Sequence, residues 1–222
     1  MSVKGFDTIT KILTQAQVNT LLNNSYYPAV FVGRYLRSAP GSSVSKHLTA
    51  AEINLLKNNN IRIVSLFEYQ GSPASYYNAV VGNTHAADAI SAANCFTQPA
   101  STPIYFCVDC STSPYEISHY IIPYFTAIQN KLNNAYLNPN GYTMGIYGNA
   151  YACYRLKQEF PSIKTMVTGN LTQYGITFTK ANIIQNTIGV DIQYNGTHLT
   201  VDKDTASNSY GGWFPTGDPG PL

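Results

Sequence analysis

Carboxylates that follow apolar, strand-like runs are the residues of this sequence best suited to chemistry. The chain has only 11 acidic residues among 222, and four of them stand directly after such runs: Asp7, Glu68, Asp109 and Asp202. Carboxyl groups that meet in one site change one another's pKa, so one can hold a proton while its neighbour is ionised. Hydrolysis of a glycosidic bond requires a pair of this kind.

Strand alternation predicts where two of these side chains point. In an extended run the side chains alternate between two faces, which places Asp109 on the same face as Tyr105 and Cys107. The same alternation groups Asp7 with Gly5. A competing interpretation is that each acid only caps the helix that follows, as aspartate often does. Glu68 fits that interpretation poorly, because glutamate is not a preferred cap.

Neutral and aromatic side chains accompany the same strand ends and are candidate ligand-binding residues. They are Arg34, Tyr35, Tyr69, Tyr147, Asn149, Gln185 and Trp213. Arg34 has an alternative role as an ion-pair partner that keeps an inward acid ionised. Trp213, the only tryptophan, is suited either to stacking on a sugar ring or to closing the core.

The cysteines and histidines do not form a recognisable metal-binding pattern. Cys107 and Cys110 have the C-x-x-C spacing, but the sequence has no second pair of that kind and its four histidines are far apart. Cys107 also lies inside an apolar run rather than at a helix start, where a reactive thiolate would be favoured. We therefore expect buried, inert thiols, no metal and no cofactor.

Composition excludes several classes of function. Charged residues make up 11% of the chain and the net charge is +2, so the basic surface that nucleic-acid binding needs is absent. No apolar run approaches the ~20 residues of a membrane-spanning helix. The first residues lack the apolar region of a signal peptide. The 18 tyrosines suit a protein that works among carbohydrates, because aromatic faces stack on sugar rings.

Strand-like and helical patterns alternate along the whole chain. Strands are expected at 3–7, 29–35, 61–67, 103–108 and 142–147, and more weakly at 164–167, 182–185 and 199–201. Helical patterns occupy 12–22, 49–57, 86–96, 115–132 and 151–158. Repeated strand–helix units predict a parallel sheet covered by helices, and about eight strands predict a (β/α)8 TIM-like barrel with irregular or shortened last units. An open doubly wound sheet is the alternative. We expect one domain over residues 1–222.

Seven short motifs, in order, resemble a known family. They are Gly5-Phe6-Asp7-Thr8, the run from Phe31 to Leu36, the run from Lys46 to Glu52, Leu66-Phe67-Glu68-Tyr69, Asp88-Ala89, the run from Pro103 to Asp109, and Gly145-Ile146-Tyr147-Gly148. Together they are similar to the bacterial glycoside-hydrolase-like TIM-barrel family, formerly a domain of unknown function, which is related to the family-25 lysozymes. The resemblance covers residues 3 to about 150 well; beyond them, Gln185 and Asp202 resemble residues of those lysozymes' seventh and eighth strands.

The resemblance implies an acidic barrel mouth and a cell-wall or polysaccharide ligand. Asp7, Glu68 and Asp109 match the family's strand-end acids. The family-25 lysozymes carry Asp-x-Glu after the fourth strand, whereas Ser111 stands at the place of that glutamate, and serine cannot donate a proton at useful acidity. We therefore expect Glu68 as the general acid, Asp109 as base, nucleophile or orienter of an acetamido group, and Asp7 as electrostatic support.

Three functions follow as hypotheses. The first is hydrolysis of peptidoglycan or a related amino-sugar polysaccharide. The second is a non-catalytic carbohydrate-binding barrel, which the missing Asp-x-Glu glutamate favours, and the third is an envelope- or phage-associated structural module. We expect a monomer with a polysaccharide or peptidoglycan ligand, no nucleic acid partner and no membrane-spanning segment. We expect a secreted or envelope-associated protein; the alternative is a cytoplasmic one.

Overall fold

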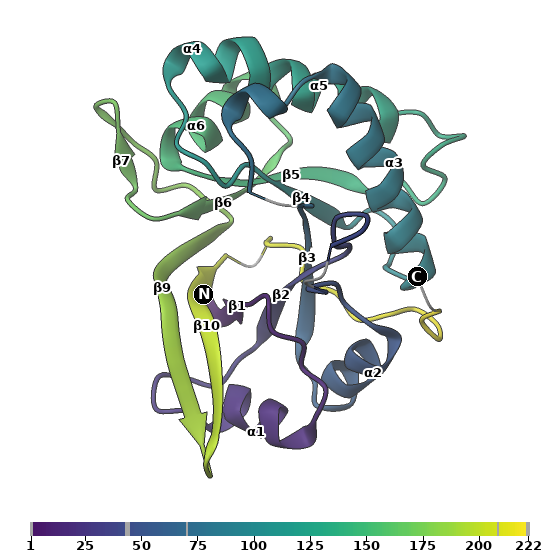
Figure 1. Cartoon of the computed structure of the whole chain (residues 1–222), viewed down its shortest axis with the longest axis vertical. Helices are drawn as coiled ribbons and strands as arrows, with labels where there is room; N and C mark the ends of the chain where they lie inside the picture. The colour runs from purple at the N-terminus through teal and green to yellow at the C-terminus, as the bar shows by residue number, and fades with distance from the viewer. Residues whose placement is uncertain (1, 43–44, 70, 208, 221–222) are drawn as a thin grey trace.

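Eight strands close into a barrel in the computed structural model, which describes residues 2–42, 45–69, 71–207 and 209–220 (Figure 1). Their order around the barrel is β1-β10-β9-β6-β5-β4-β3-β2. The strands are β1 (Val3–Asp7), β2 (Phe31–Tyr35), β3 (Arg62–Phe67), β4 (Pro103–Cys107), β5 (Thr143–Gly148), β6 (Lys164–Thr168), β9 (Ile183–Tyr194) and β10 (Thr197–Ala206). A separate small hairpin consists of β7 (Thr172–Gln173) and β8 (Ile176–Thr177).

The barrel is mixed rather than wholly parallel, which corrects the expected (β/α)8 arrangement. Strands β1 to β6 and β9 run parallel, whereas β10 is antiparallel to both of its neighbours, β9 and β1. The β7–β8 hairpin lies between β6 and β9 in the sequence, in a stretch for which no helix was predicted. The α/β character and the closed barrel are confirmed, while the final unit is a β-hairpin.

A two-residue turn explains why the chain reverses after β9. Asn195 and Gly196 both have positive φ, 47° and 78°. Asn-Gly is the preferred pair for the two-residue hairpin turn whose twist matches that of the flanking strands. Beyond the barrel the hairpin packs beside α1 (Figure 1), where the Thr20 hydroxyl donates to the Thr197 carbonyl at 3.4 Å.

Helices cover the outside of the parallel strands. They are α1 (Gln15–Asn23), α2 (Ala50–Asn58), α3 (Ala79–Cys95), α4 (Pro114–Glu116), α5 (Ile122–Leu132) and α6 (Ala150–Glu159), with a 3-10 turn η1 (Ala74–Tyr76) and a π-helical segment η2 (Ile117–Ile121). The segment η2 ends two residues before Pro123, which has no N–H to donate into the helix. Within the part of the chain that the structure describes, no helix has both the length and the apolar character needed to cross a membrane.

Two apolar layers form the core. The larger layer lies between the strands and the helices, and the smaller one fills the barrel interior. Aromatic side chains close the interior at the end where the parallel strands begin. There the Tyr105 hydroxyl donates to the Tyr210 carbonyl at 2.7 Å, and the centres of the Phe31 and Tyr210 rings lie 4.8 Å apart. The four cysteines are free, and Cys107 and Cys153 are buried. Aromatic side chains thus fill the interior at the end where the parallel strands begin.

Candidate functional site at the barrel mouth

The three acids proposed as catalytic surround one buried thiol at the C-terminal ends of the parallel strands. Burial, and then the charges of Glu68, Asp109 and Asp7, raise the pKa of the Cys107 thiol well above its usual value. The Lys46 ammonium acts in the opposite direction on the same thiol. Side chains that are 41 to 102 residues apart in sequence thus meet at one mouth, because parallel strands end on one face of a barrel.

Asp7 is the most deeply placed of these three acids. Its carboxyl group is 2% exposed, and a Cβ at Gly33 would come within 2.7 Å of the Asp7 Cβ, so the neighbouring strand must carry glycine. Burial is the main cause that raises the pKa of Asp7 from 3.8 to about 7, and the nearby charge of Asp202 adds to it. Asp7 therefore exchanges a proton near neutral pH.

One amide joins Asp7 to a second carboxyl group. The Gln185 Nε2 donates to Asp7 Oδ2 at 2.8 Å and to Asp202 Oδ2 at 2.9 Å. The Gln185 Oε1 accepts hydrogen bonds from the Tyr147 and Thr168 hydroxyls, which fixes the orientation of the amide. Three of the expected ligand-binding residues, Tyr147, Gln185 and Asp202, thus form one network with Asp7.

Asp202 lies at the mouth, but its position within its strand differs from the expected one. It does not end a strand, because β10 continues to Ala206 and runs antiparallel to its neighbours. It lies opposite Asp7 in the β1–β10 register and accepts a hydrogen bond from the Gly189 N–H at 2.6 Å. Asp202 is half-buried; burial first and then the charge of Asp109 raise its pKa.

Glu68 forms an ion pair with a lysine that was not predicted as a site residue from the sequence. The Lys46 ammonium forms an ion pair with Glu68 Oε2 and lies 4.0 Å from the centre of the Tyr35 ring. Both charged side chains are about nine-tenths buried. The other oxygen, Glu68 Oε1, is buried and has no hydrogen-bond partner among residues 2–42, 45–69, 71–207 and 209–220. Glu68 thus offers a desolvated acceptor for a donor that enters the mouth.

The remaining expected residues at this end lie nearer the rim. Asp109 is exposed, and its charge acts on Asp202 and on Tyr147. Tyr69 is turned toward α3, where its hydroxyl donates to the Asp88 carboxylate. Asn149 caps α6 through the Ala152 N–H and donates to the Thr112 hydroxyl at 2.8 Å, so its amide already has structural partners.

Two residues expected to bind a ligand are buried elsewhere. Arg34 points away from the barrel interior, because Gly33 and Tyr35 occupy the inward positions of β2; its Nε donates to Glu52 at 2.7 Å and it is fully buried. Trp213 lies outside β3, pairs with Ile63 and donates from Nε1 to the Ser65 hydroxyl at 2.9 Å. Trp213 closes the core, which was the alternative role considered for it, and Arg34 is an ion-pair partner.

Two residues at the mouth, Lys46 and Asp204, were not predicted as site residues from the sequence. Lys46 begins one of the family motifs, but a single lysine in a loop carries no signal of a role at the site. Asp204 did have a signal: it lies two positions after Asp202, so strand alternation places both on one face. The structure confirms this alternation, because Asp204 is fully buried opposite Gly5 in the β1–β10 register.

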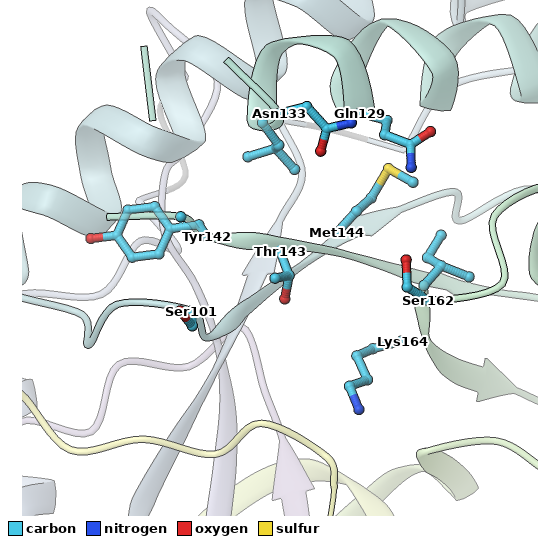
Figure 2. Close-up of a pocket in the computed structure, with 11 residues that line it drawn as sticks. Ser101, Gln129, Asn133, Tyr142, Thr143, Met144, Ser162 and Lys164 are labelled. Atoms are coloured by element: carbon cyan, nitrogen blue, oxygen red, sulfur yellow. The ribbon is translucent and has the colours of Figure 1, made fainter. Parts of the chain in front are cut away.

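A separate pocket lies at the opposite end of the barrel. Its volume is about 400 Å³, and it opens where β5 and β6 begin (Figure 2). Thr143 and Lys164 line it, as do the side chains of Gln129 from α5 and of Asn133, which follows the end of that helix. None of the residues expected to bind substrate lines this pocket. The carboxylate mouth and this pocket are therefore distinct features at opposite ends of the strands.

Comparison with known sequences finds one family and long relatives. The family described as "Rv2525c-like, glycoside hydrolase-like domain" matches residues 22–206. The chain is 26% identical over 205 residues to FadG of Bacillus subtilis (strain 168), covering 92% of this chain and 33% of FadG. It is 30% identical over 172 residues to YbfG of the same organism, covering 73% of this chain and 23% of YbfG. The chain thus spans a third or less of the length of these relatives.

Comparison with solved structures finds the same fold in cell-wall lytic enzymes. The Tat-secreted Mycobacterium tuberculosis protein Rv2525c, crystallised with L-tartrate, matches with a TM-score of 0.73 at 20% identity over 95% of this chain and 98% of its own. The autolysin LytC of Streptococcus pneumoniae, in complex with a synthetic peptidoglycan ligand, has a TM-score of 0.59 at 14% identity and covers 93% and 47%. The spore cortex lytic enzyme SleM of Clostridium perfringens has a TM-score of 0.51 at 12% identity and covers 94% and 68%.

Proposed function

Because the chain belongs to the Rv2525c-like, glycoside hydrolase-like family, we propose that it hydrolyses glycosidic bonds in peptidoglycan or a related amino-sugar polysaccharide. The observation that carries the proposal is the pair of carboxyl groups Asp7 and Asp202, joined by the Gln185 amide at the barrel mouth. The proposed setting is the cell envelope after secretion, which the Tat-secreted and cell-wall lytic structural neighbours support.

The general acid is better assigned to this pair than to Glu68. A glycosidic oxygen must receive a proton as its bond breaks, and the donor must hold that proton near the working pH. Burial and the charge of Asp202 raise the pKa of Asp7 to about 7. Glu68 already accepts from the Lys46 ammonium. Burial raises the pKa of Asp202 as well; this half-buried member of the pair contacts the substrate and donates the proton to the glycosidic oxygen, and Asp7 then returns a proton to the Asp202 carboxylate.

The other acids then take complementary roles. Asp109 is exposed at the rim and serves as base or nucleophile, or holds the acetamido group of the substrate. Glu68 Oε1, which is buried and unpartnered within the described chain, accepts a hydrogen bond from a sugar hydroxyl or amide. Tyr35 and Tyr147 supply aromatic walls at the base of the mouth.

A second candidate is a carbohydrate-binding barrel without turnover. Two observations favour it: Ser111 stands where related lysozymes have the Asp-x-Glu glutamate, and the Lys46 ion pair occupies one oxygen of Glu68. Such a protein would retain the carboxylates as hydrogen-bond acceptors for sugar hydroxyls. The two candidates differ in turnover but share the same ligand and the same mouth.

Hydrolysis and binding can be measured separately on purified peptidoglycan and on chitin oligosaccharides. We expect the wild type to release reducing ends, and Asp7→Asn and Asp202→Asn each to lower kcat about 100-fold or more, because general acid catalysis contributes about 10²–10⁴. Both variants should still sediment with the polysaccharide. The matched control is Asp191→Asn, which changes an exposed acid on the β9–β10 hairpin.

The outcomes separate the candidates. Binding by the wild type without release of reducing ends would contradict hydrolysis and support the binding barrel. Equal turnover by the wild type and by Asp7→Asn and Asp202→Asn would remove the acid pair from the mechanism. Absence of both binding and turnover would leave the barrel as a structural module.

A further inference from the structure

Asp204 is a buried acid to which the proposed function assigns no role. It lies on β10 with its side chain inside the barrel, beside β1 and one inward-facing position deeper than Asp202. Its exposed fraction is 0%. Neither of its carboxyl oxygens accepts a hydrogen bond from any N–H or O–H among residues 2–42, 45–69, 71–207 and 209–220. An ionised carboxylate in such a place would be very costly, since nothing compensates its lost hydration.

The neighbour of Asp204 is Asp7. A side-chain hydrogen bond joins the two carboxyl groups. Two ionised carboxylates cannot form a hydrogen bond with each other, because both are acceptors only, so one of them must carry a proton. Burial first and then the charge of Asp7 raise the pKa of Asp204 well above its usual value. Asp7 accepts a hydrogen bond from the Gln185 amide, whereas no N–H or O–H of the described residues reaches either oxygen of Asp204, so the proton of the pair resides on Asp204.

We propose that Asp204 is a positioning residue that stays protonated and donates a hydrogen bond to Asp7, forming with it a buried carboxyl–carboxylate pair beneath the mouth. The inference rests on the proposed function only in its purpose, which is to stabilise the ionised form of Asp7 after that group has given up its proton. A hydrogen bond to the charged form of an acid favours ionisation. Without Asp204, Asp7 would hold its proton too tightly to exchange it at neutral pH.

Other ionisable groups surround this pair and set the background for its titration. The charge of Asp202, on the same strand, acts on both members, and the Tyr27 hydroxyl donates to the backbone carbonyl of Asp204 at 3.3 Å. Groups from the other strands that interact with the charge of Asp7 are Arg34, Tyr35, Cys107 and Tyr147. Arg34 is the only cation in this set, and it stabilises the ionised form of Asp7.

The direction in which Asp7 titrates after substitution of Asp204 tests the proposal. If Asp204 is a proton donor, Asp204→Leu removes the donor and shifts the midpoint of Asp7 upward by about one pH unit or more. Asp204→Asn keeps a donor of similar size and leaves the midpoint near that of the wild type. If Asp204 were an ionised carboxylate, both variants would remove a negative charge and shift the midpoint downward.

The measurement is a carbon-13 NMR titration of labelled aspartate carboxyls, with Asp7→Asn to assign the signal and Asp191→Asn as the control. Infrared spectroscopy of the wild type should also show a protonated carboxyl band above neutral pH that Asp204→Asn abolishes; this readout remains if Asp204→Leu does not fold. A downward shift in both variants, or no such band, would overturn the proposal. Neither readout requires turnover, so failure of the proposed hydrolysis would leave this test intact.

Discussion

Asp204, Asp7 and Asp202 form a sequence of acids that runs from the barrel interior toward solvent. Their burial decreases in that order, from fully buried to half-buried, and their interactions change with it. Asp204 has no N–H or O–H donor within the described chain, whereas Asp7 shares the Gln185 amide and Asp202 also accepts from the Gly189 N–H. Differences in environment, rather than in residue type, give the three acids different affinities for a proton.

The raised pKa of Asp7 predicts a pH dependence of stability. Asp7 binds its proton with a pKa of about 7 in the folded chain and 3.8 when unfolded, so between about pH 4 and pH 7 the folded state binds more protons. The free energy of unfolding should therefore fall as the pH rises through this range, by at most about 1.4 kcal/mol per pH unit from this group, and level off above it.

Urea unfolding across this pH range measures the effect. Asp7→Asn should lack the part of the fall that Asp7 causes, since the amide does not titrate. The exposed acid Asp191 provides the control, and Asp191→Asn should follow the wild-type curve. A curve for Asp7→Asn parallel to that of the wild type would show that Asp7 does not carry the proton.

At the level of elements, the β9–β10 hairpin places two of these three acids. Gly196 occupies the second turn position with φ 78°, and a Cβ there meets no atom within 4 Å, so the cost of a side chain is conformational. Gly196→Ala should lower the free energy of unfolding by about 1–2 kcal/mol, because L-residues disfavour left-handed backbone. Chemical denaturation tests this against Gly217→Ala, where φ is not positive. An equal loss in both variants would contradict the turn argument.

The sequence predicts the elements better than their directions. Strands β1 to β6 were located within two residues because they are apolar runs bounded by polar segments. The last two strands were expected at 182–185 and 199–201 and proved far longer, because exposed polar residues such as Asn186 and Thr187 continue them beyond their apolar runs. The Asn195-Gly196 pair, a strong hairpin signal, would have indicated the antiparallel return of β10.

The same distinction holds for the candidate site. Strand ends and alternation indicated Asp7, Glu68 and Asp109, whose meeting depends only on parallel strands. Lys46 could not have been found in this way, because its contact with Glu68 depends on the path of the loop after β2. The ion pair of Arg34 with Glu52 could not be predicted either, because it joins a strand to the helix α2 and the pattern of one strand does not record such a contact. The sequence around a strand does not reveal on which side of the strand a long charged side chain finds its partner.

At the scale of the whole molecule, the C-terminal segment around Trp213 packs against the outer side of the barrel and stabilises it. Trp213 is 2% exposed, pairs with Ile63 through the backbone and bonds to Ser65. Trp213→Ala should lower the free energy of unfolding by about 3–5 kcal/mol through the cavity it creates, while leaving polysaccharide binding unchanged. Thermal unfolding and sedimentation with peptidoglycan measure the two effects, with the exposed Tyr136→Ala as control. Loss of binding in a folded Trp213→Ala protein would contradict this assignment.

The antiparallel direction of β10 also decides where the polypeptide leaves the barrel. β1 starts at the face away from the carboxylates, and β10 returns the chain to that same face, where the Gly220 N–H bonds to Cys95 at the end of α3. A polysaccharide bound at the proposed site would therefore lie at the end of the barrel opposite the first and last described residues.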